Sequence, residues 1–225
     1  MTPSRVPLPC RPPHGDNGIW FGAVNGPLSL LDWRRRVAAL YAEIRAEPDP
    51  LAAHALWCAT HRELLATHPE SPVPAAERAA YAGPPIAGYD PLLRHVVEVD
   101  TDVAPQRLEV PTGTDGFVPF ERIGRLHVPG VGDLDVWRLA SYGGGVFVPV
   151  RDALAGSETY GGGRYLIDTA KGADLGGDER SLVVDFNFAY NPSCAYDPAW
   201  ACPLAPPGNV VATPLRVGEL YDPGG

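Results

Sequence analysis

The sequence predicts an α+β protein in which N-terminal helices pack on a mainly antiparallel β-sandwich or barrel of about eight strands. Two observations lead to this prediction. Apolar side chains recur at helical spacing over residues 29–68, whereas the chain after Gly83 consists of short β-branched or aromatic runs separated by Gly, Pro and Asp. No helical pattern of about ten residues interrupts those runs, which disfavours alternating β and α units. The 25 Gly and 26 Pro among 225 residues indicate many turns.

Two helices are well marked in the first part of the chain. The first is expected to begin at Ser29, which is a suitable cap with an acidic residue three positions later. The second is expected to begin at Asp49 and Pro50, a cap followed by a favoured first-turn proline, and to run to about His68. A short third helix is expected over residues 74–81.

The remaining chain divides into strand-like runs near residues 94–99, 106–110, 117–128, 134–140, 146–151, 164–168, 182–190 and 209–217. This pattern predicts one globular unit with three parts. They are a proline-rich, disordered N-terminus (1–18), a helical segment (19–83) and a β domain that carries the site (84–220).

Composition excludes several classes of function. The formal charge of −9 disfavours binding to nucleic acid, which a basic surface would favour, and to anionic lipid. No apolar run approaches the length of a transmembrane helix, and the N-terminal residues lack the apolar centre of a secretory signal. A cytoplasmic protein with reduced thiols is therefore expected, and its four cysteines do not form a disulfide scaffold. Nothing in the sequence specifies the oligomeric state.

The richest polar stretch is the run over residues 143–203. If 182–190 is a strand, alternation places Asp185, Asn187 and Asn191 on one face and the aromatic residues on the core face. This polar face is either the solvated side of a sheet or the floor of a pocket. Asp and Asn are poor strand formers, which favours the pocket.

Arg164 follows three successive glycines and shares a strand face with Leu166 and Asp168. A glycine turn followed by Arg can bind a carboxylate or phosphate, although no Walker or dinucleotide motif is present. A salt bridge from Arg164 to Asp152 or Asp185 is an equal alternative. The nearby carboxylates Asp152 and Glu158 suit acid–base work or a hard metal, or simply hydrogen-bond to a turn.

Cys194 and Cys202 are separated by seven residues, too far apart for the usual zinc pair, and no histidine follows His127. A thiol nucleophile lacks a recognisable histidine partner, and a disulfide is disfavoured in a cytoplasm. A structural role in fixing an irregular loop is preferred. Neither a metal nor a cofactor is expected, and no G-x-S-x-G serine motif is present.

Two blocks, FVPVRDALAGSETYGGGRYLIDT and VVDFNFAYNPSCAYDPAWACPLAPPGN, resemble hallmark segments of an uncharacterised bacterial family, domain of unknown function 1684. The stretch LDWRRRVAALYAEIRA is similar to the opening of that family. The resemblance implies no settled activity. It groups as one unit Arg151 or Asp152, Glu158, Tyr160, Arg164, Tyr165, Asp185, Asn187, Tyr190, Asn191, Cys194, Tyr196, Cys202 and Asn209.

The leading functional hypothesis is a small-molecule enzyme with hydrolase-like or lyase-like acid–base chemistry on an anionic substrate. Asp185 or Glu158 would be the general acid or base, and Arg164 would bind the anionic group. The alternatives are a non-catalytic binding module and a structural or interaction protein, in which the same residues form a buried network. The further substrate-binding candidates are Tyr160, Asn187, Asn191, Arg151 and Tyr190.

Overall fold

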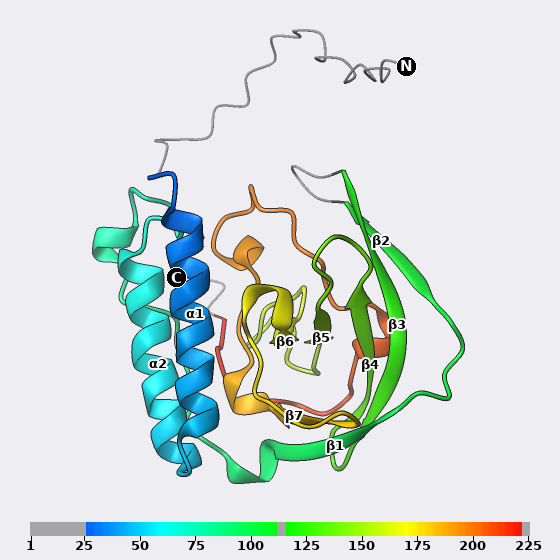
Figure 1. Ribbon diagram of the computed structural model, residues 1–225. Coiled ribbons are helices and arrows are strands. Elements are labelled where there is room, and N and C mark those ends of the chain that lie inside the picture. The colour runs from blue at the N-terminus through cyan, green and yellow to red at the C-terminus, as the bar shows by residue number, and fades with distance from the viewer. Residues whose placement is uncertain (1–25, 112–115, 222–225) are drawn as a thin grey trace, which may run out of the picture.

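The computed structural model describes residues 26–111 and 116–221 and confirms the α+β class (Figure 1). Two helices lie on one side of a single curled antiparallel sheet. The predicted disordered segment 1–18 lies outside the described residues. The main elements are α1 (Ser29–Ala46), α2 (Pro50–Thr67), β1 (Arg94–Asp100), β2 (Arg107–Pro111), β3 (Phe117–Val128), β4 (Gly132–Leu139), β5 (Val146–Val150), β6 (Arg164–Asp168) and β7 (Ser181–Asp185).

The sheet has the strand order β6-β5-β4-β3-β1-β7, and β2 adds to β3 as a side branch. Its curvature brings the two edges of this order together. Tyr165 in β6 and Tyr190, just after β7, exchange main-chain hydrogen bonds of 2.8 and 3.1 Å. The described residues therefore form a partly closed barrel of seven strands rather than two stacked sheets.

The interior of this barrel is filled partly by the C-terminal segment. A strand was expected over 209–217, and this expectation is wrong, because the segment makes only an isolated bridge between Val210 and Arg151. Pro214 cannot donate to a strand ladder. Instead Val211, Leu215 and Val217 are buried among apolar side chains of the sheet, so the segment completes the core.

The two helices pack against the residues that directly follow β7. Tyr41 of α1 and Trp57 of α2 pack in one apolar cluster with Phe188. The predicted cap of α2 is confirmed, since the Asp49 carboxylate accepts a hydrogen bond from the amide of Leu51 at 3.0 Å.

Two expectations about the helical part need correction. Leu28, not Ser29, occupies the cap position of α1, and the Ser29 hydroxyl donates to Glu70 instead. The predicted third helix over 74–81 is reduced to one 3-10 turn, Arg78–Ala80.

The predicted strand over 182–190 is also wrong beyond its first half. β7 ends at Asp185, whose carboxylate accepts the amide hydrogen of Asn187 at 3.0 Å and so begins the 3-10 turn Phe186–Phe188. Side chains of a 3-10 turn do not alternate between two faces. Asn187 and Phe188 are consequently both buried, and no polar face exists there. All five residues of β6 are likewise buried, so it has no polar face either.

Gly124 permits the close approach of β1 to β3, next to the point where the register of the β3–β4 pairing shifts. A Cβ atom at this position would lie 2.3 Å from Val99 Cγ1 and 2.9 Å from the carbonyl oxygen of Asp100. We expect Gly124→Ala to lower the free energy of unfolding by about 1–3 kcal/mol through overpacking, measured by urea denaturation. Gly88→Ala is the matched control, because a Cβ there meets nothing within 4 Å. Equal losses of unfolding free energy in the two variants would contradict the close approach of β1 to β3 at Gly124.

Candidate functional site

The structure separates the predicted site residues into three places. Arg164, Asn191 and Glu158 all contact the C-terminal segment, defined here as residues 213–221. Asp185 and Asn187 lie together near the connection between α1 and α2. Tyr160 lies beside the two cysteines of the 191–203 loop. The prediction of a single pocket made by Arg164, Glu158, Asp185 and Asn191 therefore does not match the geometry.

Arg164 is fully buried and uses its guanidinium to hold the C-terminal segment. It donates to the carbonyl oxygens of Leu215 at 2.8 Å and Glu219 at 3.0 Å, and also to that of Val217. Its charge is paired with Asp152 at 2.9 Å. Burial lowers the pKa of Arg164, and the adjacent carboxylate opposes this shift. The Asp152 alternative left open by the sequence is thus the one adopted. Nε has no hydrogen-bond partner among the described residues, but it is buried with the rest of the guanidinium and is out of reach of a substrate.

Asp152 completes this attachment from the other side of the ion pair. Its carboxylate also accepts hydrogen bonds from the Thr159 hydroxyl at 3.0 Å and the Leu154 amide at 2.8 Å. Asp152 is therefore a buried structural anion that fixes the turn before the glycine run, consistent with the turn-bonding role considered from the sequence.

A second attachment is centred on Glu219, whose side chain is completely buried. Its carboxylate accepts from the amide and the side-chain nitrogen of Asn191, both at 3.0 Å, and from the Tyr196 hydroxyl. His61 Nε2 of α2 lies 3.1 Å from the same carboxylate. Four groups from two separate segments thus meet at one carboxylate, which links α2 and the 191–203 loop to the C-terminal segment.

The remaining predicted residues lie at the margins of these attachments. Glu158 is partly exposed and pairs with Arg216, and its carbonyl accepts the amide hydrogen of Tyr221 at 2.8 Å. Arg151 is exposed and donates to the carbonyl of Gly161 at 2.8 Å, so the glycine run is held by a side chain. Tyr190 is half-buried, and its ring packs edge-on against Tyr165 at 5.6 Å.

Asp185 is the predicted catalytic residue that lines a hollow, of about 100 Å³. Phe188 and Leu175 form an apolar part of its wall, while Arg94 and Arg45 bring positive charge. The nearest arginine atom, Nε of Arg94, is 3.8 Å from the Asp185 carboxylate. A carboxylate and arginines therefore do share a small polar hollow, but the arginines are not Arg164.

The hollow holds Asp185 in an environment that favours its protonated form. The carboxylate is buried and accepts from Asn187 Nδ2 at 2.7 Å and from the Tyr89 hydroxyl at 3.2 Å. Burial raises the pKa of Asp185 and outweighs these hydrogen bonds and Arg94, which act to lower it. Asn187 itself is used internally, because it also bonds both main-chain groups of Asp90 at 2.7 and 2.8 Å.

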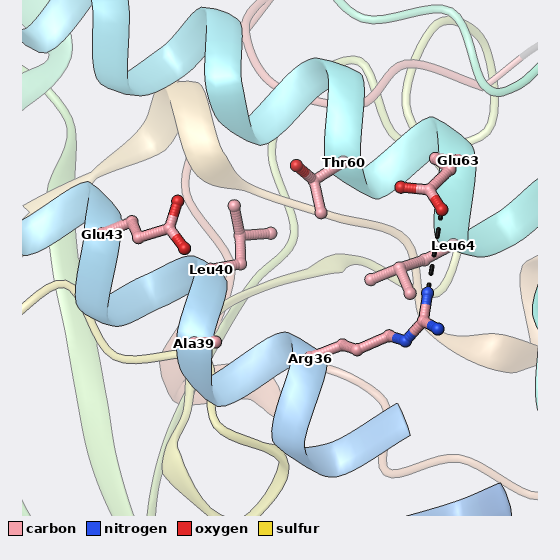
Figure 2. A pocket seen from close by; sticks show the side chains of 7 residues that line it. All are labelled: Arg36, Ala39, Leu40, Glu43, Thr60, Glu63 and Leu64. Carbon is pink, nitrogen blue, oxygen red and sulfur yellow. Dashed lines mark ion pairs between the residues drawn. The ribbon is translucent and has the colours of Figure 1, made fainter. Parts of the chain in front are cut away.

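A larger hollow of about 230 Å³ is the outer groove between α1 and α2 (Figure 2). Figure 2 shows Arg36 and Glu63 reaching across it, and their charged atoms are 3.7 Å apart. Leu40 and Leu64 form its floor. Arg36 and Glu63 are exposed and pair with each other at the surface, as is common between neighbouring solvated helices.

The third place is the thiol pair, Cys194 and Cys202. The amide of Cys194 donates to Cys202 Sγ at 3.3 Å, and the Tyr160 hydroxyl lies 3.5 Å from Cys194 Sγ. Both cysteines are unbonded and partly exposed.

Within residues 26–111 and 116–221, no group of three His, Cys, Asp or Glu side chains is arranged to hold a metal ion. In the same residues, no helix is long and apolar enough to cross a membrane.

Comparison with known proteins extends the resemblance seen in the sequence. Residues 79–220 match the model of the family described as "Protein of unknown function (DUF1684)". The chain belongs to this family. An uncharacterized protein of Haloarcula marismortui, solved in solution by NMR, is similar at 30% identity with a TM-score of 0.55. The alignment covers 75% of this chain and 92% of that one. No curated protein matches.

The family match includes Asp152, Arg164, Asn191 and Glu219, so both attachments of the C-terminal segment are formed largely within it. His61 lies outside the matched residues. Sequence reasoning missed Glu219 and Arg94, because both stand in short stretches with no motif. A buried Glu after Gly218 leaves no periodic signal, and Arg94 reads as an ordinary exposed strand residue.

Arg164→Met tests the attachment of the C-terminal segment. It leaves the Asp152 carboxylate buried without its cation, which typically costs about 3–5 kcal/mol. We expect urea denaturation to show a loss of that size. Arg216→Met is the control, since Arg216 is exposed and its pair with Glu158 is worth about 0–1 kcal/mol. Similar losses in both variants would show that Arg164 does not hold the segment.

The raised pKa of Asp185 predicts a distinctive pH dependence. The folded protein binds this proton more tightly than the unfolded chain, so the stability contributed at this site falls as pH rises above about 3.9. The unfolding free energy of the wild type minus that of Asp185→Asn should therefore decrease between about pH 3.5 and 7.

Asp178→Asn is the control of opposite sign for the same denaturation series. Hydrogen bonds from the amides of Arg180 and Ser181 lower the pKa of Asp178, so its contribution is lost as pH falls. The corresponding difference should increase with pH. A flat or rising difference for Asp185 would contradict its assignment as a carboxyl group that favours the protonated form.

Proposed function

We propose that the protein acts on a small anionic molecule at the Asp185 hollow, with Asp185 as general acid or base and Arg94 as the anion-binding group. The observation that supports this most strongly is the position of Asp185. It is a buried carboxyl with a raised pKa, in a small hollow that also contains arginine. A shifted titratable group in such a place is the usual character of a proton-transfer residue.

Arg94 is suited to anion recognition because no close ion pair neutralises its guanidinium charge inside the protein. Its side chain is 42% exposed, and its contact with Asp185 is long at 3.8 Å. Arg45 lies on the rim but is engaged by the carbonyl and carboxylate of Asp174. Glu47 also lines the rim and opposes binding of highly charged anions. These charges favour a compact anion of low charge, such as a carboxylate.

Protonated Asp185 can donate a proton to a substrate held by Arg94, and the carboxylate formed is then stabilised by Asn187 and Tyr89. The volume of about 100 Å³ suits the reacting group of a small molecule. This arrangement supports hydrolase-like or lyase-like chemistry. A non-catalytic binding module would use the same arginine without proton transfer.

The binding step is tested with sodium acetate and inorganic phosphate titrated into ¹⁵N-labelled protein, against sodium chloride at equal ionic strength. We expect saturable shifts for acetate in the amides of residues 183–188 and in the Arg94 side chain. Arg94→Ala should abolish them, and Arg107→Ala should not, because Arg107 lies at an exposed strand position. Responses identical to those of chloride would overturn the proposal.

The proton-transfer step is tested with p-nitrophenyl acetate and p-nitrophenyl phosphate as turnover probes. Asp185→Asn should retain acetate binding and lower the turnover rate by about 10²-fold or more, the usual contribution of general acid–base catalysis. Binding without turnover of either probe would support the binding module in place of the enzyme.

A further inference from the structure

The geometry points to a second reactive site: Cys194 and Cys202 form a redox-active dithiol that exchanges with small-molecule disulfides. This site is independent of the Asp185 hollow and is formed by the 191–203 loop together with Tyr160. Nothing in it requires a metal or a cofactor.

The two thiols are adjacent and accessible. Cys202 Sγ accepts a hydrogen bond from the amide of Cys194 at 3.3 Å, which brings the two residues together. Neither cysteine is buried, in contrast to the usual structural cysteine, which is inert because it is enclosed. The chain between them has only one short 3-10 turn, Ser193–Ala195, so the sulfurs can approach without breaking a strand or a long helix.

The surroundings favour a thiolate on Cys194. The hydrogen bond from the Cys202 thiol, with a further one from Tyr160, lowers the pKa of Cys194 to about 6. The same interaction raises the pKa of Cys202, which therefore keeps its proton. Lys171, whose ammonium lies 5.4 Å from the Tyr165 ring centre, adds positive charge nearby. One nucleophilic thiolate beside one protonated thiol is the arrangement of an attacking and a resolving cysteine.

Cys58 provides an internal comparison. It lies in α2 with its sulfur 3.7 Å from His54 Nε2, yet burial raises its pKa. Among residues 26–111 and 116–221, no second thiol donates to it. All three cysteines are partly exposed, so the two loop cysteines differ from Cys58 through their pairing.

The exchange proceeds in two balanced steps with a disulfide RSSR as the oxidant. The Cys194 thiolate attacks one sulfur of RSSR, a Cys194–SR bond forms, and RS⁻ leaves. The proton of Cys202 passes to RS⁻, giving RSH, and the Cys202 thiolate attacks Cys194 Sγ. This forms the Cys194–Cys202 disulfide and expels a second RS⁻, which takes the proton released when Cys194 ionised. Two electrons pass from the pair to RSSR, which is reduced to two RSH.

The first test is alkylation with iodoacetamide between about pH 5 and 9, followed by peptide mapping. We expect a midpoint for Cys194 near pH 6. At pH 6 Cys194 should react about tenfold faster than a thiol of ordinary pKa, because the gain in thiolate outweighs the loss of nucleophilicity. Cys202→Ala should shift the midpoint to higher pH. Alkylation of Cys194 no faster than that of Cys58 would overturn the proposal.

The second test uses glutathione disulfide and mass spectrometry on Cys10→Ala/Cys58→Ala protein, in which only the pair remains. The expected product has lost two hydrogen atoms and carries no glutathione. Cys202→Ala in the same background should stop at the mixed disulfide on Cys194, and Cys194→Ala should react far more slowly. A mixed disulfide that persists in protein containing both cysteines would show that Cys202 does not resolve it, and would overturn the dithiol.

Discussion

The fold depends on one buried cation. Arg164 joins the edge strand β6 to three alternate carbonyl groups of the C-terminal segment and is balanced by Asp152 inside the same core. A buried guanidinium is tolerated only when its charge is paired and its donors are largely satisfied, so β6, the turn at Asp152 and the last residues of the chain have to assemble together. The curled sheet is therefore completed by a segment that is not a strand.

This constraint explains why the polar density of residues 143–203 resembles a ligand site. Much of it does bind a peptide, but that peptide is the chain's own C-terminal segment. Glu219 holds the same segment with a buried negative charge, since His61, Asn191 and Tyr196 all contact its carboxylate. Residues committed to such internal hydrogen bonds are poor substrate ligands, because binding a substrate would leave their present partners unpaired in the interior.

The two sites proposed for chemistry lie outside these attachments. Asp185 borders a hollow beneath the connection between the helices, and the thiol pair belongs to the loop that leads from Asn191 to Pro203. Asp185 is buried but lines a hollow that also contains the partly exposed Arg94, and the two loop cysteines are themselves partly exposed. Arg164 and Glu219, in contrast, are fully enclosed. The rigid attachments hold the strand and the loop that carry these groups in place, so structural and reactive residues are interleaved along one stretch of sequence.

The sequence by itself determined the class of the fold, both main helices, most strands and the family, because these depend on local periodicity, capping residues and dense motifs. It also marked Arg164 and Asp185 as unusual. It did not reveal that β7 ends at Asp185, because a side-chain hydrogen bond to Asn187 overrides strand alternation there. Only the tertiary structure decided the partners: Glu219 with Asn191, Arg94 with Asp185, and Cys194 with Cys202. Contacts between distant residues depend on the path of the whole chain, and spacing along the sequence carries no record of that path.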